Sequence, residues 1–286
     1  MHRRSLLAGL AASAVAAPAY AQFNLGNLIQ GAANVVGAYS SGESDEIQMG
    51  QTYYQDYLTK SGGAYPDRNA QEALRKFAQP LLKAADRQNL PWEVTLVKSD
   101  QVNAWALPGG KLAINSALVK YCATPDELAS VISHEVGHAD HGHGLSQIRN
   151  QSLLQGAGTI GKEALSAWMG NAGAIGAQAL SALEGPLYSL ILSGYSRDNE
   201  FEADAHILKI FERTGYDPDK ADDFFRTLIK LHPESDTSTT SLFSTHPGTR
   251  DRIARIEAAA AKASRASGAQ TSGWNDLKAI FPTPAT

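Results

Sequence analysis

The segment His134-Glu135-Val136-Gly137-His138 contains two histidines four positions apart, with a glutamate directly after the first. Residues at this spacing lie one turn apart on a helix, so both imidazoles can reach the same ion. Two imidazoles and one carboxylate leave a tetrahedral zinc ion with an open position for water. Glu135 is then placed to accept a proton from that water and to pass it to a leaving amine. The segment predicts metal-assisted hydrolysis.

A third ligand is needed, and a later acidic pair supplies the preferred candidate. Glu200 and Asp204 are four positions apart, so they share one face of a helix. One carboxylate can bind the metal while the other holds the second ring nitrogen of a ligand histidine. His141 is the alternative third ligand, because it follows His134 by seven positions. Gly142 would fray the helix at that point, so Glu200 is preferred.

His246 lies between a Ser/Thr-rich segment, residues 232–245, and Pro247. Three roles stay open for it. It can donate a hydrogen bond to the transition state, or occupy the open metal position and keep the enzyme inactive, or simply form a turn before the proline. Of the other polar residues nearby, we expect His143 to be exposed and Glu202 to point away from the site.

The helix that must carry the two histidines is marked by its N-terminus. Thr124 is a favourable N-cap, Pro125 fits the first helical position, and Glu127 completes a capping box. We expect this helix to continue to about Asp140. A second helix, expected over residues 197–214, carries the acidic pair.

The rest of the chain alternates between helical periodicity and one β-rich region. Further helices are predicted over 46–60, 69–88, 220–231 and 249–266. Strands are predicted over 92–97, 102–107 and 111–115, the last two joined by Pro108-Gly109-Gly110. The fold class is therefore α+β, mainly helical, with a small β-meander beside the helix of the two histidines.

Residues 1–21 have the features of a cleavable signal peptide. Arg3-Arg4 precedes an apolar stretch over 6–17, and Ala19-Tyr20-Ala21 is a cleavage pattern. A membrane anchor is less favoured because the apolar stretch is short. Ordinary secretion and twin-arginine export both stay open. The single cysteine, Cys122, allows no intramolecular disulfide and is not placed to carry a lipid. We expect an exported, soluble periplasmic protein without a lipid anchor.

The remaining domain plan follows from the segment boundaries and the predicted zinc site. We expect an N-terminal extension over 22–42, a domain over 43–266 that carries this zinc site, and a flexible C-terminal tail over 267–286. The Gly/Ala-rich segment 151–192 carries scattered charges that argue against a clean transmembrane span. We expect it to pack on the domain or cover its cleft, and peripheral membrane contact stays open. The formal net charge is −4 and no basic stripe interleaves with aromatic residues, so no nucleic acid is expected as a partner.

Three motifs in order resemble the gluzincin metalloproteases of the group that includes BepA, LoiP, HtpX and the CAAX prenyl proteases. They are the HExxH segment 134–138, the segment 196–204 and Thr245-His246-Pro247, and the likeness covers about residues 43–265. The resemblance implies a zincin-type metalloprotease domain with one zinc ion per chain. It implies His134, His138 and Glu200 as ligands.

The same resemblance implies roles for the residues around the ligands. Glu135 would be the general base, and Asp204 would hold a ligand from behind. His246 and Arg252 would act as catalytic residues near the reacting carbonyl. Asn103 matches the edge strand along which such enzymes bind substrate. Simpler roles stay open for both: Arg252 can pair with an acid on its own helix, and Asn103 can end a turn.

The chain also departs from that group. BepA-like proteins add helical repeats, LoiP-like proteins carry a lipid, and HtpX and the prenyl proteases have long apolar spans. None of these features is expected here, so the chain resembles a minimal soluble member, for which prenylated peptides are not expected as substrates.

Two classes of function follow. The first is a zinc endopeptidase that degrades unfolded or misfolded envelope proteins. The second is a periplasmic chaperone-like binding module with a largely structural zinc site. Glu135 favours the first, because a structural site needs no base beside an open metal position.

Overall fold

The computed structural model describes residues 43–148, 194–231, 245–246, 249–265 and 267–284. The predicted signal peptide and N-terminal extension, residues 1–42, and the Gly/Ala-rich segment 151–192 lie outside the described residues. Of the helices within the described ranges, none has both the length and the apolar composition that crossing a bilayer requires.

The α+β class and the predominance of helix are confirmed. The elements in chain order are α2 (Glu43–Lys60), α3 (Arg68–Lys83), β1 (Glu93–Val97), β2 (Ala104–Leu107), β3 (Lys111–Asn115), α4 (Ser116–Tyr121), α5 (Pro125–Asp140), α9 (Arg197–Thr214), the 3-10 helix η1 (Pro218–Lys220), α10 (Asp223–Leu231), α12 (Thr249–Ala260) and α13 (Trp274–Ile280).

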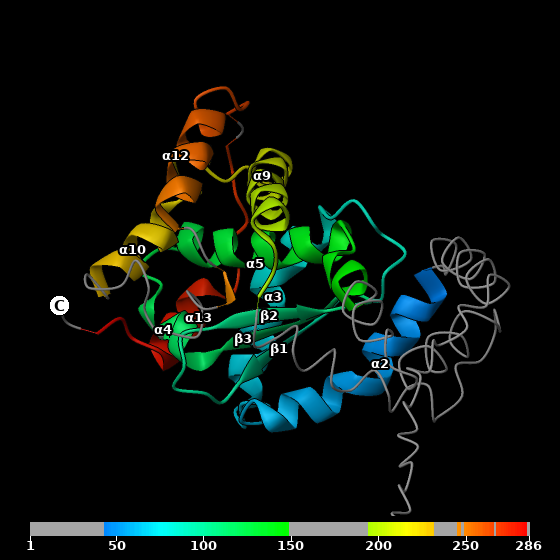
Figure 1. Cartoon of the computed structure of the whole chain (residues 1–286). Helices are drawn as coiled ribbons and strands as arrows, with labels where there is room; N and C mark the ends of the chain where they lie inside the picture. Colours follow the sequence, from blue (N-terminus) through cyan, green and yellow to red (C-terminus); the bar gives the residue numbers. More distant parts are fainter. Residues whose placement is uncertain (1–42, 149–193, 232–244, 247–248, 266, 285–286) are drawn as a thin grey trace, which may run out of the picture.

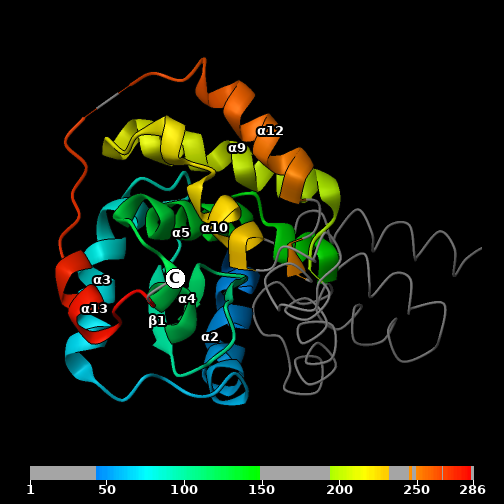
Figure 2. The same ribbon diagram turned by 90° about the vertical axis from the view of Figure 1, so that its left-hand side faces the viewer.

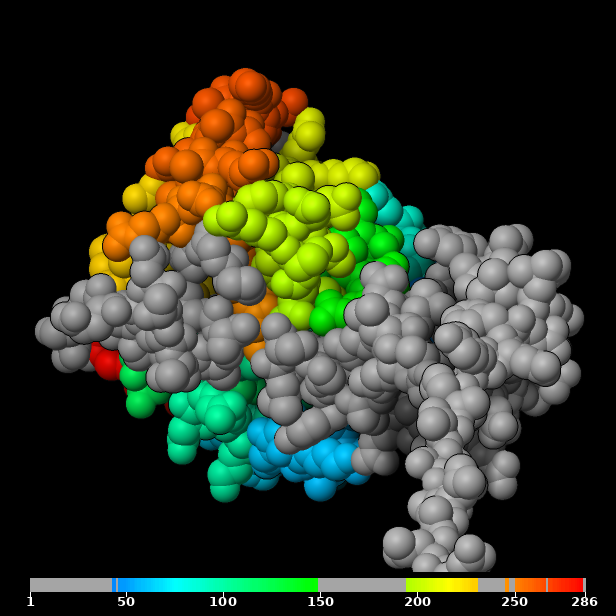
Figure 3. All heavy atoms as spheres, viewed as in Figure 1, coloured from blue at the N-terminus to red at the C-terminus, as the bar shows by residue number. Residues whose placement is uncertain are grey.

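Helix α5 lies at the centre of a layered arrangement. It packs against α9 on one side and β2 on the other, while α2 contacts β3. In Figure 1, α5 crosses the middle of the molecule, with α9 and α12 above it and the sheet and α2 below it. Figure 2 shows α9 and α12 side by side above α5. In the space-filling view α9 and α12 form the upper surface (Figure 3).

The side chains of β2 alternate between two apolar clusters. Ala104 and Ala106 belong to the large cluster that includes residues of α3 and α5. Trp105 and Leu107 belong to a second cluster with the tyrosines of α2. Period-two alternation therefore buries both faces of this strand, and the sheet is covered by helices on both sides.

The strand order differs from the expected meander. The order is β1-β3-β2, with β1 parallel to β3 and β2 antiparallel to β3. The hairpin between β2 and β3 is closed by Gly109 and Gly110, whose φ angles are +78° and +73°. The residues over 98–103 are long enough to cross one intervening strand, so β3 can insert between its two predecessors. Among the described residues no strand pairs with the outer edge of β2.

The local sequence of α5 explains both its start and its fit. Thr124 Oγ1 accepts a hydrogen bond from the Glu127 N–H at 3.3 Å, as the predicted cap requires. At Gly137 an added Cβ would lie 2.9 Å from His206 Cβ and 3.0 Å from Ala203 Cα. The absence of a side chain at Gly137 therefore allows α9 to approach the helix that carries the two histidines.

The C-terminal segment is not a flexible tail throughout, as was expected of residues 267–286. Residues 274–280 form α13, which packs on α3. Leu277 is fully buried, and Trp274 packs against Phe77. Trp274, Leu277 and Phe281 follow an i, i+3, i+7 pattern, a local signal of an amphipathic helix.

Candidate metal centre and active site

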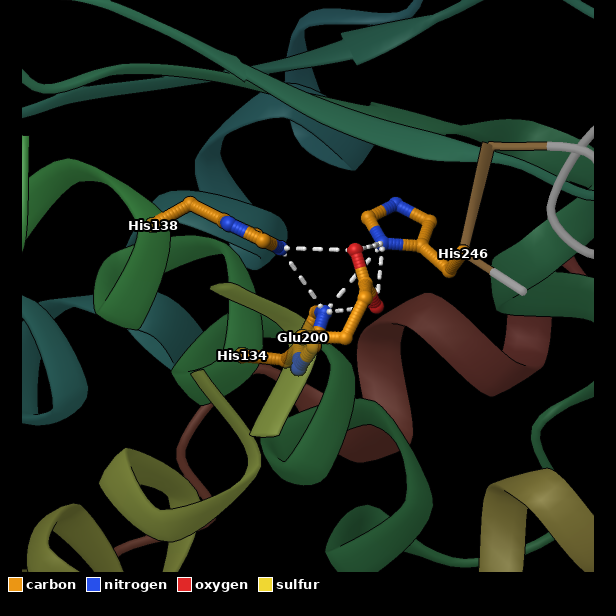
Figure 4. Close-up of side chains that lie close together, drawn as sticks. All are labelled: His134, His138, Glu200 and His246. Atoms are coloured by element: carbon orange, nitrogen blue, oxygen red, sulfur yellow. Dashed lines mark hydrogen bonds and ion pairs between the residues drawn. The ribbon is translucent and has the colours of Figure 1, made fainter. Parts of the chain in front are cut away.

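Four buried side chains converge between α5, α9 and the pair Thr245–His246. His134 Nε2 lies 3.0 Å from His138 Nε2 and 3.4 Å from Glu200 Oε2. His138 Nε2 lies 3.5 Å from Glu200 Oε1. With His246 these residues each offer a ligand atom within 4.8 Å of the others. Figure 4 shows the four side chains pointing toward one another from separate parts of the fold.

The donor atoms fit a zinc ion. Two ligands bound tetrahedrally at about 2.1 Å lie roughly 3.4 Å apart, close to the separations of 3.0 to 3.5 Å found here. Imidazole and carboxylate are also ligands that zinc accepts. The alternative third ligand, His141, is exposed at the C-cap of α5 and lies outside the cluster of four.

Asp204 lies directly behind His134, in the position that the i, i+4 spacing predicts. Its Oδ1 lies 3.1 Å from His134 Nδ1. This contact leaves His134 Nε2 for the metal side and gives Nδ1 an acceptor for its hydrogen.

The ionisation of the two α5 imidazoles differs. Burial and the Arg252 charge oppose protonation of His134, but hydrogen bonds to Asp204 and Glu200 outweigh them and raise the pKa of His134 to about 9. Burial lowers the pKa of His138 well below its usual value. His138 is therefore neutral near pH 7, whereas His134 must lose a proton when it binds a metal.

Arg252 is fully buried behind His134 and Glu200, although its expected place was near the reacting carbonyl. Its guanidinium holds both Asp204 oxygens, at 2.6 and 2.7 Å, and Glu200 Oε2 at 2.6 Å. Burial would raise the pKa of Glu200, but the electrostatic effects of His246 and Arg252 hold it well below its usual value. These contacts suit a group that orients the two carboxylates.

Glu135 is almost completely buried beside the cluster. Neither of its oxygens has a hydrogen-bond partner among the described residues, and His246 Nε2 lies 3.4 Å from Oε1. Burial raises the pKa of this carboxyl group. A buried carboxylate oxygen without a donor is costly, so the position of Glu135 suits a group that accepts a proton. The adjoining cavity, lined also by Tyr195 and Ala104–Ala106, measures about 10 Å³, close to the space that one water molecule needs.

His246 contributes the fourth donor atom. Its Nδ1 lies 3.1 Å from each Glu200 oxygen and 3.2 Å from His134 Nε2. Of the three roles considered, this placement favours occupation of the open metal position. The neighbouring Thr245 hydroxyl lies 3.5 Å from Asn103 Oδ1. Asn103 directly precedes the edge strand β2, and its side chain is buried.

Three residues around His138 were missed in the sequence. The Tyr195 ring stacks on the His138 imidazole, with centroids 3.8 Å apart and an interplanar angle of 16°. His143 was expected to be exposed, but it is 4% exposed, and its Nδ1 lies 2.9 Å from His138 Nδ1. Glu202 was expected to point away, yet it contacts His143. None of these contacts follows from helical spacing, because the chain turns at Gly142.

Comparison with known proteins identifies a peptidase family and several protease relatives. The family model "Peptidase family M48" matches residues 68–260. The beta-barrel assembly-enhancing protease of Escherichia coli K12 is 27% identical over 212 residues, 73% of this chain and 42% of that protein. The metalloprotease YcaL of the same strain is 28% identical over 207 residues, 70% of this chain and 77% of the relative.

A eukaryotic relative is also named as a metalloendopeptidase. The mitochondrial metalloendopeptidase OMA1 of Arabidopsis thaliana is 27% identical over 198 residues, 68% of this chain and 37% of that protein. The chain thus spans about two fifths of the length of several relatives. The family model covers more than half of this chain and includes both helices of the metal centre. The chain therefore belongs to peptidase family M48.

Proposed function

We propose that this chain is a zinc-dependent endopeptidase, with His134, His138 and Glu200 as the zinc ligands. The observation that carries the proposal is that two helices bring these three donors together beside a buried carboxylate, Glu135, that has no hydrogen-bond partner within the described part of the chain. A structural metal site would not need such a carboxylate next to the ligands. The metalloprotease relatives support the same activity.

The proposed reaction is hydrolysis of a peptide bond. Bound zinc would polarise the carbonyl group and acidify a water molecule. Glu135 accepts a proton from the water molecule while the water oxygen attacks the carbonyl carbon. Glu135 then delivers this proton to the amide nitrogen as the C–N bond breaks. Asp204 and Arg252 hold the ligands in place during these steps. His246 would first have to leave the cluster, and it could then donate to the developing oxyanion.

Substrate binding is proposed along the outer edge of β2. An extended peptide can add to such an edge through main-chain hydrogen bonds, which tolerate many sequences. Asn103 lies at the start of this edge and would contact the substrate. Because unfolded segments expose their backbone, this mode suits unfolded or misfolded proteins.

The proposed clients are misfolded or mislocalised proteins of the bacterial envelope, and the proposed location is the periplasm. The signal-like N-terminus supports export. One group of relatives is named for beta-barrel assembly, which is consistent with envelope clients. Peripheral contact with the membrane belongs to the same proposal.

The decisive test is cleavage of casein by the purified chain, with and without a chelator, beside Glu135→Gln. A general base contributes about 10²- to 10⁴-fold, so Glu135→Gln should lose most of the activity while it still binds zinc. Zinc addition should restore activity after chelation. Equal cleavage by wild type and Glu135→Gln would show that the catalytic assignment is wrong.

A second candidate function has one observation in its favour. His246 supplies a fourth protein donor, and four protein ligands are typical of structural zinc sites. Such a structural site would fit a chaperone-like binding module. This module would suppress the aggregation of casein without cleaving casein, and Glu135→Gln would not change the suppression.

A further inference from the structure

The ligand His138 is connected to the protein surface through a second imidazole. His138 Nδ1 lies 2.9 Å from His143 Nδ1, and His143 Nε2 lies 2.9 Å from Glu202 Oε2. His143 is 4% exposed, whereas the Glu202 side chain is 60% exposed. The three side chains therefore form a continuous hydrogen-bonded series from the buried cluster to the solvent.

The direction of these hydrogen bonds follows from the chemistry of imidazole. His138 Nε2 faces His134 and Glu200, so it is the nitrogen available to a metal. In a neutral ring the hydrogen must then be on Nδ1, which donates to His143 Nδ1. His143 in turn carries its hydrogen on Nε2 and donates it to the Glu202 carboxylate. Every donor in the series has one acceptor.

The other ligand on α5 is held differently. His134 Nδ1 contacts the Asp204 carboxylate directly, and Arg252 binds both oxygens of that carboxylate. No carboxylate contacts His138 Nδ1 among the described residues, and the imidazole of His143 occupies the corresponding place. The Tyr195 ring stacks on the imidazole face of His138, so it restrains the ring through its face and not through Nδ1.

The fold places His143 for this contact. Gly142 follows α5 with φ +64°, a conformation that glycine adopts without strain. The turn brings the next residue back beneath the last turn of α5, next to α9, from which Glu202 projects.

We propose that His143 and Glu202 are positioning residues of the metal centre. His143 holds His138 in the tautomer and ring orientation that present Nε2 to zinc, and Glu202 holds His143 in the matching tautomer. This inference rests on the proposed zinc peptidase function, and it assigns the two residues no contact with substrate.

The main test is the zinc dissociation constant, measured on the full chain by competition with a chromophoric chelator. Loss of such an outer partner typically weakens metal binding about 10- to 100-fold, and this loss is expected for His143→Phe. His143→Gln should recover part of it, because its amide can accept from His138 and donate to Glu202. Glu202→Ala should also weaken zinc binding. Because the Glu202 side chain is exposed, this substitution should leave the fold intact, so weaker binding could not be attributed to misfolding.

His141→Phe is the matched control. The His141 ring stacks on His143 with an interplanar angle of 14°, but His141 is exposed and outside the hydrogen-bonded series. It should bind zinc as the wild type does. Histidine-selective ¹⁵N NMR of the zinc-loaded chain should show hydrogen on Nδ1 of His138 and on Nε2 of His143.

Several results would overturn the proposal. They are unchanged zinc binding in His143→Phe, equal weakening in His143→Phe and His143→Gln, or hydrogen on Nδ1 of His143. A second zinc ion lost in His141→Phe would instead assign His141, His143 and Glu202 to a separate metal site, for which they lie close enough. Because the readout is zinc binding, a chain that binds zinc without cleaving casein would refute the proposed function and leave this inference standing.

Discussion

His246 brings its Nδ1 to 3.2 Å from His134 Nε2 and 3.1 Å from the Glu200 carboxylate. A catalytic zinc ion keeps one position for water, whereas a fourth protein ligand closes the site. His246 Nε2 also lies 3.4 Å from Glu135, so the same imidazole contacts both the ligands and the proposed base. This arrangement corresponds to a closed state of the centre.

We therefore expect His246→Ala to increase the basal cleavage of casein. The increase should be about tenfold if the closed state is favoured by about 1.4 kcal/mol. Zinc affinity should fall, because one donor is lost. The exposed histidine variant His141→Ala is the control and should change neither quantity. A loss of cleavage in His246→Ala would show that donation to the oxyanion outweighs the effect of the closed state.

The protonation of His134 predicts a pH dependence of zinc binding. Its pKa is raised to about 9 in the metal-free chain, so the ring is protonated at pH 7 and must release a proton on binding zinc. Apparent zinc affinity should rise with pH, by up to about tenfold per pH unit, and level off above about pH 9. Calorimetry in buffers of different ionisation enthalpy measures the released protons. No release at pH 7 would contradict the assignment.

At the scale of elements, the centre depends on how closely α5 and α9 approach. The proposed ligands His134 and His138 lie on α5 and Glu200 lies on α9, so the distance between the helix axes sets the distance between the donors. Gly137 lies in the interface, opposite Ala203 and His206. It has no catalytic chemistry of its own, and we assign it a packing role.

Gly137→Ala tests this dependence. The added methyl group must push the helices apart by several tenths of an ångström, and overpacking of this kind costs about 1–3 kcal/mol. The better helix propensity of alanine offsets about 1 kcal/mol of that cost. We expect weaker zinc binding and a lower free energy of unfolding, measured by urea titration of the zinc-loaded chain. A variant that binds zinc and unfolds like the wild type would rule out the packing role.

Local signals predicted the elements better than their connections. The cap at Thr124 located the start of α5, and glycines 109 and 110 located the β hairpin. The order β1-β3-β2 was not predicted. Strands β1 and β3 are separated in the sequence by β2, and their pairing produces no pattern of neighbouring residues that the sequence would show. Helix α4 was also missed, since its six residues are too few to show periodicity.

At the scale of the whole molecule, the C-terminus completes the core. Trp274, Leu277 and Phe281 pack against residues near the N-terminal end of the domain, among them Phe77 and Tyr65. Lys278 donates to the Cys122 carbonyl oxygen at 2.9 Å. Segments from opposite ends of the described chain therefore share one apolar cluster.

Leu277→Ala should measure this contribution. Leu277 is completely buried, and removal of a buried leucine side chain typically costs about 2–5 kcal/mol. The free energy of unfolding, followed by tryptophan fluorescence in urea, should fall by an amount in that range. Asn275→Ala, on the exposed side of α13, is the control and should have little effect. Equal stability of both variants would mean that α13 does not contribute to the core.

The cavity beside Glu135 is small. It is lined by residues of β2, Tyr195 and His246 and measures about 10 Å³, close to the space that one water molecule needs. The small cavity and the placement of His246 thus describe the same state of the molecule.

Relations between residues of one helix could be predicted from the sequence. His134, Glu135 and His138 are related by the helical repeat, as are Glu200 and Asp204, and their placement agrees with that repeat. Contacts between different elements became known from the folded chain: His143 and Tyr195 meet His138, and Arg252 lies behind both carboxylates. The reason is physical, because a helix imposes a short-range period on its own side chains, whereas contacts between distant segments depend on how the whole core packs.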